Sequence, residues 1–574
     1  MRHAQRMYAV RGLELHSLYA WDYTWILQVM DMMTRLGMNT LVLHRNDYVD
    51  ALVYPGTYFG YRAKETDSSI FDVYSQIFRK VYQYTPTRRS CLYQKRVFLK
   101  RVLEQARRRG LQVYIENKEL FFPDILLEFH PELVHEGHIC ATDPFWIDFL
   151  KEKYKEFFRD FPEVSGIITS PATGESKVSI KSNRCTCPRC LRTSKEKWFN
   201  DILHAMYTVL HDAGKELIVR DFVFDPAAQK EIASVMTELP EDVIISLKNT
   251  PHDYYPTFPE NPRIGHVGTH RQWIEFDTMG QYFGWGVCVA DLMEDYRQRL
   301  KDAQEKGASG AIFRLDWESL DGHTSFGTPN KINVYSAGWL TQDIDTPAED
   351  IYRCFLENEG WLQDGEPVED AVRWFGSIME KTWNITSKTV FVNGSVFSDS
   401  STMPLSVDHA VWLAEEKNSL KDWNASKALN LSPLQDSLKA AVLEKTMALK
   451  EMELLWRRSA AAPSAICADK ALWLHNWLGI SLKYVQMFYY AACTILRARY
   501  LLEGGTSDEA FRLEVFQILK QQLEEVDRMK ESLQSFFYET DHTPHIIYTL
   551  LDPDRLECLK QNIESALAEN GITF

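Results

Sequence analysis

Four polar side chains follow one apolar run, and their types suit work on a charged substrate. The run "EDVII" (241–245) is rich in β-branched residues and predicts a buried strand. It leads into "LKNTPHDYYP", which carries Lys248, Asn249, His252 and Asp253. A cation and a carboxylate placed where a strand leaves the core could bind an anionic group and activate water.

Polar clusters of this kind recur at the ends of other predicted strands. Most runs are apolar and are separated by amphipathic segments that end in a glycine, as helices commonly do. The runs are 12–16, 39–47, 111–119, 165–175, 216–224, 242–250, 272–278 and 310–318. This alternation predicts a (β/α)8 TIM barrel over 1–345. Between Asp253 and Arg271, three prolines make a long helix unfavourable and indicate a loop.

The strand ends of such a barrel meet at one face, where reacting groups lie. The candidates there are carboxylates with a few cations and histidines: Glu14, His16, His44, Asp47, Glu116, Lys118, Glu175, Arg220, Lys248, Asp253, Glu275, Asp277, Arg314, Asp316 and Glu318. Solvated ion pairs at the barrel rim are the simpler explanation for any single member. Paired carboxylates with many aromatic residues suit glycoside hydrolysis, and Lys or Arg beside them suit an acidic sugar.

The sequence excludes several other chemistries. We find no Gly-rich phosphate loop, no G-x-S-x-G elbow and no H-E-x-x-H pair. The net charge of -16 argues against a nucleic-acid partner. No long apolar run predicts a membrane span, and no secretory signal is visible, so we expect a cytoplasmic protein.

Three successive motifs resemble the barrel of family 67 glycoside hydrolases, the xylan α-glucuronidases. They are "ELIVRDFVF", "VIISLKNTPHDYYPTFP" and "IEFDTMGQYFG". The resemblance implies that Arg220 and Lys248 contact the sugar carboxylate and that Glu175 is the general acid. It implies that Asp253, with Glu275, activates water with inversion.

This chain departs from the family pattern at two positions. Pro171 stands where the family has a lysine, and Gln281 stands where it has a second glutamate. A distant relative with another substrate is therefore expected. The alternatives are a sialidase- or hexosaminidase-type glycosidase and a sugar-binding barrel without catalysis. The remaining substrate contacts are assigned to Glu14, His16, His138, Gln281, Arg314 and Asp316.

Two further clusters could bind a metal or the substrate. Cys185, Cys187 and Cys190 in "RCTCPRC" can bind a structural zinc if a fourth ligand comes from elsewhere, and free thiols are the alternative. His130, His135 and His138 follow the third strand and could contact the sugar or, less simply, a metal. Catalysis itself is expected to need no cofactor.

The region 346–574 lacks the strand pattern and shows long amphipathic segments, which predict an all-helical C-terminal domain. The segment 469–505 is apolar around most of its circumference and predicts a buried central helix. The segment 392–404 is expected to be irregular. The family resemblance implies that this helical region carries a homodimer contact.

Overall fold

The chain was analysed as a computed structural model that describes most of the sequence. Phe224, the last residue of the predicted fifth strand, lies outside the described residues. The described residues are 7–59, 86–223, 225–320, 322–417, 423, 431–504 and 508–573.

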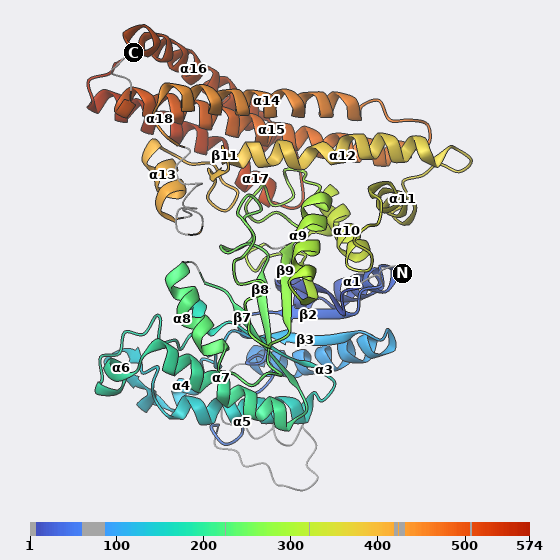
Figure 1. Ribbon diagram of the computed structural model, residues 1–574, viewed down its shortest axis with the longest axis vertical. Coiled ribbons are helices and arrows are strands. Elements are labelled where there is room, and N and C mark those ends of the chain that lie inside the picture. Colours follow the sequence, from blue (N-terminus) through green and yellow to red (C-terminus); the bar gives the residue numbers. More distant parts are fainter. Residues whose placement is uncertain are drawn as a thin grey trace. The chain divides into compact units, whose positions relative to one another are not determined.

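Eight strands close into a parallel barrel in the order β1-β10-β9-β8-β7-β6-β3-β2 (Figure 1). Their bounds are β1 Val10–Leu15, β2 Thr40–His44, β3 Gln112–Glu116, β6 Gly166–Thr169, β7 Glu216–Asp221, β8 Ile244–Lys248, β9 Gln272–Asp277 and β10 Ala308–Arg314. Each strand overlaps one of the predicted runs, so the predicted (β/α)8 barrel is confirmed. Several strands end before the polar residues of their run, which therefore lie in loops.

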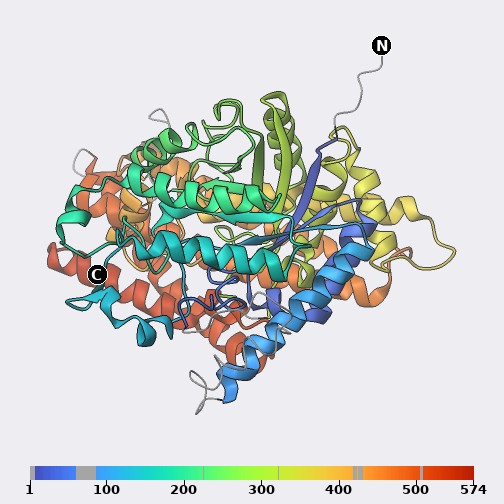
Figure 2. The same ribbon diagram turned by 90° about the horizontal axis from the view of Figure 1, so that it is seen from below.

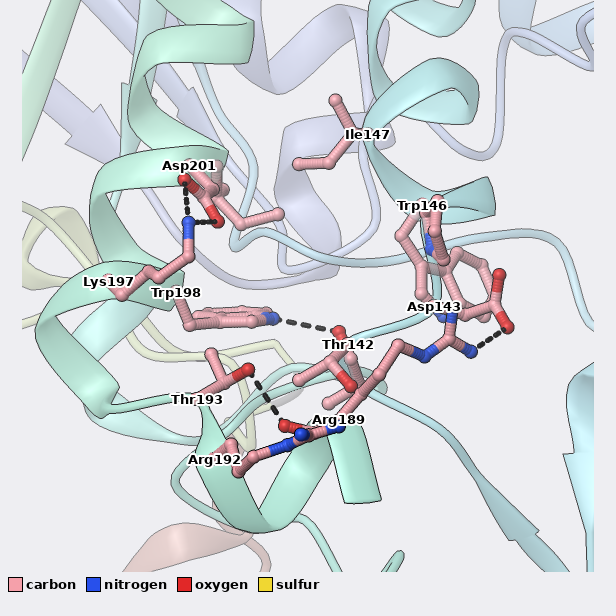
Figure 3. Close-up of a pocket in the computed structure, with 13 residues that line it drawn as sticks. Thr142, Asp143, Trp146, Ile147, Arg189, Arg192, Thr193, Lys197, Trp198 and Asp201 are labelled. Carbon is pink, nitrogen blue, oxygen red and sulfur yellow. Dashed lines mark hydrogen bonds and ion pairs between the residues drawn. The ribbon is translucent and has the colours of Figure 1, made fainter. Parts of the chain in front are cut away.

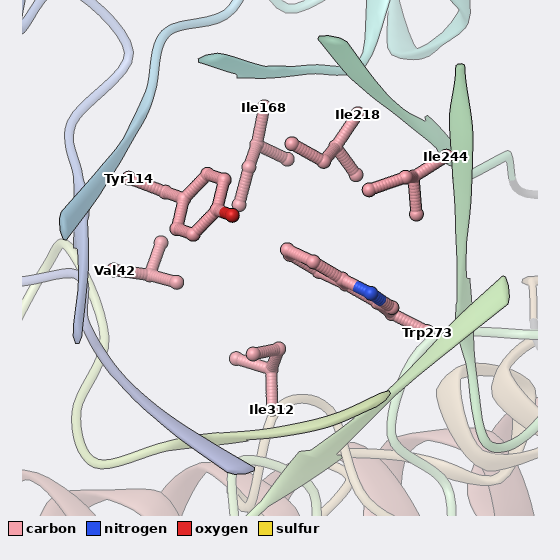
Figure 4. Packing of buried hydrophobic residues seen from close by; sticks show 7 residues of the cluster. All are labelled: Val42, Tyr114, Ile168, Ile218, Ile244, Trp273 and Ile312. Atoms are coloured by element: carbon pink, nitrogen blue, oxygen red, sulfur yellow. The ribbon is translucent and has the colours of Figure 1, made fainter. Parts of the chain in front are cut away.

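Side chains from alternating positions fill the inside of the barrel (Figure 4). Trp273 and Tyr114 meet edge to face there, with ring centroids 5.3 Å apart. The other members are Val42, Ile168, Ile218, Ile244 and Ile312. A Cβ at Gly310 would lie 2.5 Å from the Trp273 ring. The indole fits in the barrel because residue 310 of β10 is a glycine. The barrel is thus a packed core, and a substrate must bind at its end.

Amphipathic helices follow most of the strands, as the alternation predicts. They are α1 Tyr23–Arg35, α3 Pro86–Arg108, α5 Phe145–Asp160, α7 Lys195–Asp212, α8 Pro226–Met236 and α9 Met293–Glu305. Figure 2 shows α3 in blue and α5 in teal running outside the strands. Between β8 and β9 the structure has turns and no helix, which confirms the interpretation of the proline-rich segment.

The chain divides into two compact units. The first unit comprises 1–249, 261–276 and 301–314. The second comprises 250–260, 277–300 and 315–574, so it includes the segments that directly follow β8, β9 and β10. Asp253, Gln281 and Asp316 therefore belong to the second unit.

The second unit is built mainly from long helices, and α12, α14 and α15 run lengthwise beside one another (Figure 1). The helices are α10 Ile332–Leu340, α11 Ala348–Asn358, α12 Val368–Val390, α13 Val407–Trp412, α14 Gln435–Ser459, α15 Ala468–Arg499, α16 Glu509–Glu539, α17 Ile546–Leu550 and α18 Pro553–Glu569. Helix α15 is the predicted central helix, and most of its later residues are buried.

One detail of this unit bears on the prediction for the segment 392–404. The segment expected to be irregular contains a short hairpin of β11 Phe391–Val392 and β12 Ser395–Val396, so it is not without regular structure.

In the part of the chain that the structure describes, none of the helices is both long enough and apolar enough to cross a membrane.

Candidate active site

The carboxyl ends of β1, β2 and β3 hold three buried ionisable side chains in contact. His44 Nδ1 lies 2.7 Å from Glu14 Oε1, and His44 Nε2 lies 3.2 Å from Glu116 Oε1. The ring of His16 stacks on that of His44, with centroids 3.6 Å apart. Burial, followed by the charges of nearby cations, lowers the pKa of His44 well below its usual value. A neutral imidazole carries one N–H, so His44 can donate to only one of the two carboxyls.

Arg220, near the end of β7, extends this network to β9. Its Nε donates to Glu275 Oε1 over 2.9 Å and its Nη2 to Glu275 Oε2, while its Nη1 donates to Glu116. Ser246 on β8 donates to Glu275 over 2.5 Å. Arg220 is thus held in a bidentate pair with one carboxylate and bonded to a second, all of them buried.

Burial makes Glu116 a weak acid, and the charges around it act in both directions. Burial raises the pKa of Glu116 to about 8, the charges of Glu14 and Glu275 add to the rise, and the Arg220 charge opposes it. Glu116 therefore tends to keep its proton at neutral pH, and burial separates it from solvent.

Glu175 is the more exposed carboxyl, and a lysine from a different strand holds it. Glu175 follows β6 after the tight turn at Gly174, which has φ of 78°. Lys118 follows β3, and its Nζ donates to Glu175 Oε2 over 2.8 Å. The Glu175 side chain is 38% exposed, whereas that of Lys118 is 4% exposed. Glu175 can therefore meet a substrate.

The charges around Glu175 favour its ionised form. Burial alone would raise the pKa of this carboxyl, but the charge and hydrogen bond of Lys118, with the charge of Lys248, lower it. Lys248 is buried at the end of β8, and its Nζ lies 3.6 Å from the centroid of the Phe222 ring. The negative face of an aromatic ring attracts a cation, so this contact helps to hold the Lys248 ammonium in place. Arg314, at the end of β10, is buried as well.

A second buried cluster fixes the loop that carries Lys118. Lys153, on α5, donates to Glu119 Oε2 over 2.9 Å and to Asp50 Oδ1 over 3.2 Å. Asn117 donates to both of these acids, over 2.9 Å and 3.2 Å. Sequence reasoning missed this cluster, because the sequence near Lys153 gives no sign of the loop that it contacts. Lys118 was among the predicted candidates, without a specific role.

The second unit contains a polar group of its own around Asp253. Asp253 has a left-handed backbone, with φ of 51°, and its carboxylate accepts a hydrogen bond from the Tyr282 hydroxyl. Gln281 Nε2 donates to that same hydroxyl over 3.0 Å, and the rings of Tyr255 and Tyr282 stack with centroids 3.8 Å apart. Asp316 is also buried in this unit. Tyr282, the group that joins Asp253 to Gln281, was missed.

The three histidines after β3 do not join the buried network. His138 is exposed on a two-stranded hairpin, where it pairs with His135. His130 Nε2 lies 2.7 Å from the main-chain oxygen of Tyr58. The assignment of His138 to substrate binding stays a prediction.

Two groups of side chains in the described residues lie close enough together to hold a metal ion. One is Glu14, His16 and His44, whose ligand atoms all lie within 4.8 Å of one another. The other joins the three predicted cysteines to a fourth, Cys140, within the same limit. Cys140 was not among the predicted ligands.

The structure is a closed parallel (β/α)8 barrel with carboxylates gathered at its strand ends, and solved structures share this fold. A glycoside hydrolase of family 138 that targets pectin rhamnogalacturonan II is similar in structure, with a TM-score of 0.64 and 13% identity, over 98% of this chain and 84% of that one. At this identity the likeness establishes a shared fold. This likeness does not test the resemblance to family 67, which stays a prediction.

Other solved structures match with lower TM-scores. An O-GlcNAc hydrolase from Thermobaculum terrenum matches with a TM-score of 0.43 and 11% identity, over 98% of this chain and 97% of that one. A β-N-acetylhexosaminidase from Bacteroides fragilis matches with a TM-score of 0.37 and 13% identity, over 62% and 70%. These scores are too low to establish a common fold. No family model matches the sequence, and the search of curated proteins found no match.

Proposed function

We propose that the protein is an exo-acting glycoside hydrolase that releases an acidic sugar, such as a glucuronic acid, with inversion. The observation that carries this proposal is the position of Glu175, a half-exposed carboxyl bonded to Lys118 beside a ring of buried, mutually paired acids. The shared fold with a polysaccharide-targeting hydrolase supports the reaction class. Catalysis on this proposal needs no cofactor.

Lys118 and Lys248 are the cations that we assign to the sugar carboxylate. Both are buried, both lower the pKa of Glu175, and a point charge is suited to an anion at a restricted site. Arg220 is proposed as a positioning residue instead, because Glu116 and Glu275 already accept hydrogen bonds from its Nε, Nη1 and Nη2. This proposal revises the role that the family resemblance implied for Arg220.

An acidic substrate would also prepare Glu175 for its reaction. In the free protein the two lysines hold Glu175 in the ionised form, which cannot donate a proton. A sugar carboxylate bound to those lysines would offset their charge and leave burial as the main influence, so the pKa of Glu175 would rise. Glu175 could then protonate the leaving oxygen as a general acid. A neutral sugar would not have this effect.

A panel of 4-nitrophenyl glycosides tests the reaction and the sugar class together. The panel should include glucuronides, galacturonides, N-acetylhexosaminides, sialosides and neutral hexosides in both anomeric forms. We expect a uronide to be the best substrate, by about ten- to a hundred-fold in kcat/KM over its neutral counterpart, since a charge-assisted contact contributes ~1.5–3 kcal/mol.

Thermal-shift measurements with the free sugars accompany the panel. Stabilisation by sugars without turnover of any glycoside would identify a binding barrel and contradict the enzyme. Fastest turnover of an N-acetylhexosaminide, which is neutral, would keep the enzyme and reject the acidic-sugar assignment built on Lys118 and Lys248. Fastest turnover of a sialoside, whose sugar also carries a carboxylate, would keep an acidic sugar and reject a uronic acid.

A further inference from the structure

We propose that Cys140, Cys185, Cys187 and Cys190 bind one zinc ion that fastens the loop after β6 to the loop after β3. This site is separate from the charged side chains described above. All four residues belong to the first compact unit. The proposal concerns structure and does not depend on the proposed hydrolase activity.

The sulfur positions fit a tetrahedral metal ion. Cys140 Sγ lies 3.5 Å from Cys190 Sγ and 3.7 Å from Cys187 Sγ, and all four sulfurs lie within 4.8 Å of one another. Zinc–sulfur bonds of about 2.3 Å place tetrahedral ligands about 3.8 Å apart. Disulfides require sulfurs about 2.05 Å apart, and all four cysteines are free.

Local contacts hold the two loops in the ligating arrangement. Cys187 caps helix α6 (Pro188–Arg192), and its sulfur accepts the N–H of Cys190 over 3.5 Å. The Thr142 hydroxyl lies 3.1 Å from Cys190 Sγ. The main-chain oxygen of Cys140 accepts the indole N–H of Trp146 over 2.9 Å. Such support around the ligands is typical of metal sites whose geometry is formed in advance.

Contacts around a neighbouring cavity of about 430 Å³ join the loop after β3 to the loop after β6 and to helix α7 (Figure 3). Arg189 pairs with Asp143 over 2.9 Å, and Trp198 donates to the main-chain oxygen of Ala141 over 2.8 Å. Arg189 is also a cation close to the cysteines. A zinc ion with four thiolates has a net charge of -2, and a neighbouring guanidinium favours that charge.

The ligand set indicates zinc in a structural role. Four thiolates fill the tetrahedral coordination sphere and leave no position for a substrate or water. Cys140 and Cys190 are buried, while Cys185 and Cys187 are partly exposed. The ion would anchor the same loop that carries Glu175, ten residues before Cys185 in the sequence.

Metal analysis of the purified full-length protein tests the site directly. We expect the wild type to contain close to one equivalent of zinc and Cys140→Ser to contain under a tenth of that amount. Cys91 is an exposed cysteine outside the group, so Cys91→Ser should contain as much zinc as the wild type. Chelator treatment should lower the melting temperature of the wild type and leave that of Cys140→Ser unchanged. Zinc-free wild type purified from zinc-supplemented culture would overturn the proposal, as would one equivalent of iron.

Cobalt substitution tests the ligands even where a variant fails to fold. Wild type reconstituted with cobalt(II) should show the intense visible bands of a tetrahedral thiolate complex. Cys91→Ser should give the same spectrum. A weak octahedral spectrum in the wild type would overturn the four-cysteine site. Because these readouts measure metal and stability, they succeed or fail independently of the glycosidase assay.

Discussion

Lys118 Nζ lies 2.8 Å from Glu175 Oε2, although the two residues are on loops that follow different strands, β3 and β6. The resembled family has a lysine four residues before its acid, where this chain has Pro171. Lys118 places a cation beside Glu175 from another strand. The pair links sugar binding to the protonation of Glu175, and the first two predictions concern it.

Removal of the Lys118 charge should raise the pKa of Glu175. A carboxyl whose pKa is lowered in the folded state contributes stability above its unfolded pKa, and that contribution is lost as pH falls through the folded value. The free energy of unfolding of Lys118→Met should therefore be lower than that of the wild type at neutral pH, and the difference should become smaller in acid. The limb of the pH profile of kcat/KM that reports Glu175 should move to higher pH. Lys177 lies on the loop that carries Glu175 and pairs with Asp124. Lys177→Met removes this other cation and should leave that limb of the pH profile in place.

Glu175→Gln tests the role of Glu175 as the general acid. The substitution keeps the shape of the side chain and removes the proton. It should lower kcat/KM by at least ~10²-fold on glycosides with poor leaving groups, and by less on aryl glycosides whose leaving group needs little protonation. Glu128→Gln, at an exposed position on the short helix α4 (Leu126–Phe129), serves as the control. Equal losses on both substrate types would assign Glu175 to another step.

Lys248→Met should act mainly on the binding of the acidic group. Loss of one charge-assisted contact costs ~1.5–3 kcal/mol, or about ten- to a hundred-fold in kcat/KM on a uronide. A neutral sugar analogue should be spared. Kinetics on both substrates measure this difference, with Lys230→Met, an exposed position on α8, as the control. Equal effects on both substrates would mean that Lys248 does not recognise the sugar carboxylate.

Asp253→Asn tests the sequence-based assignment of the water-activating residue. The variant should lower kcat while the substrate still binds, because the amide cannot accept the proton of the attacking water. Tyr282→Phe removes the hydroxyl that donates to Asp253 and should lower kcat less. Steady-state kinetics and substrate-induced melting shifts separate turnover from binding. Unchanged kcat in Asp253→Asn would reject this role.

Lys153→Met should destabilise the first unit strongly. The substitution leaves Asp50 and Glu119 as buried acids without their shared cation, and breaking a buried pair typically costs about 3–5 kcal/mol. Lys155→Met, on the same helix, breaks only an exposed pair with Glu152 and should cost under ~1 kcal/mol. Denaturant unfolding of both variants gives the comparison. Similar free energies of unfolding would show that the cluster adds little stability.

The order of apolar runs and polar clusters determined the barrel, because a strand covered on both faces needs consecutive apolar residues such as Ile244 and Ile245. The helices Gln435–Ser459, Ala468–Arg499 and Glu509–Glu539 also followed from local spacing. The candidate residues Glu175, Arg220 and Lys248 were found from the sequence because parallel strands bring their carboxyl ends to one face.

Which of those residues touch was decided only by the tertiary structure. Whether Arg220 faces a substrate or is held by Glu116 and Glu275 depends on side chains more than fifty residues apart in the sequence. Cys140 joins the three later cysteines for the same reason, since a loop after β3 meets a loop after β6. Local spacing reports which face of a strand or helix is apolar, whereas ion pairs and ligand sets depend on how distant segments pack. The sequence alone therefore determined the barrel and its candidate residues, and the tertiary structure decided their partners.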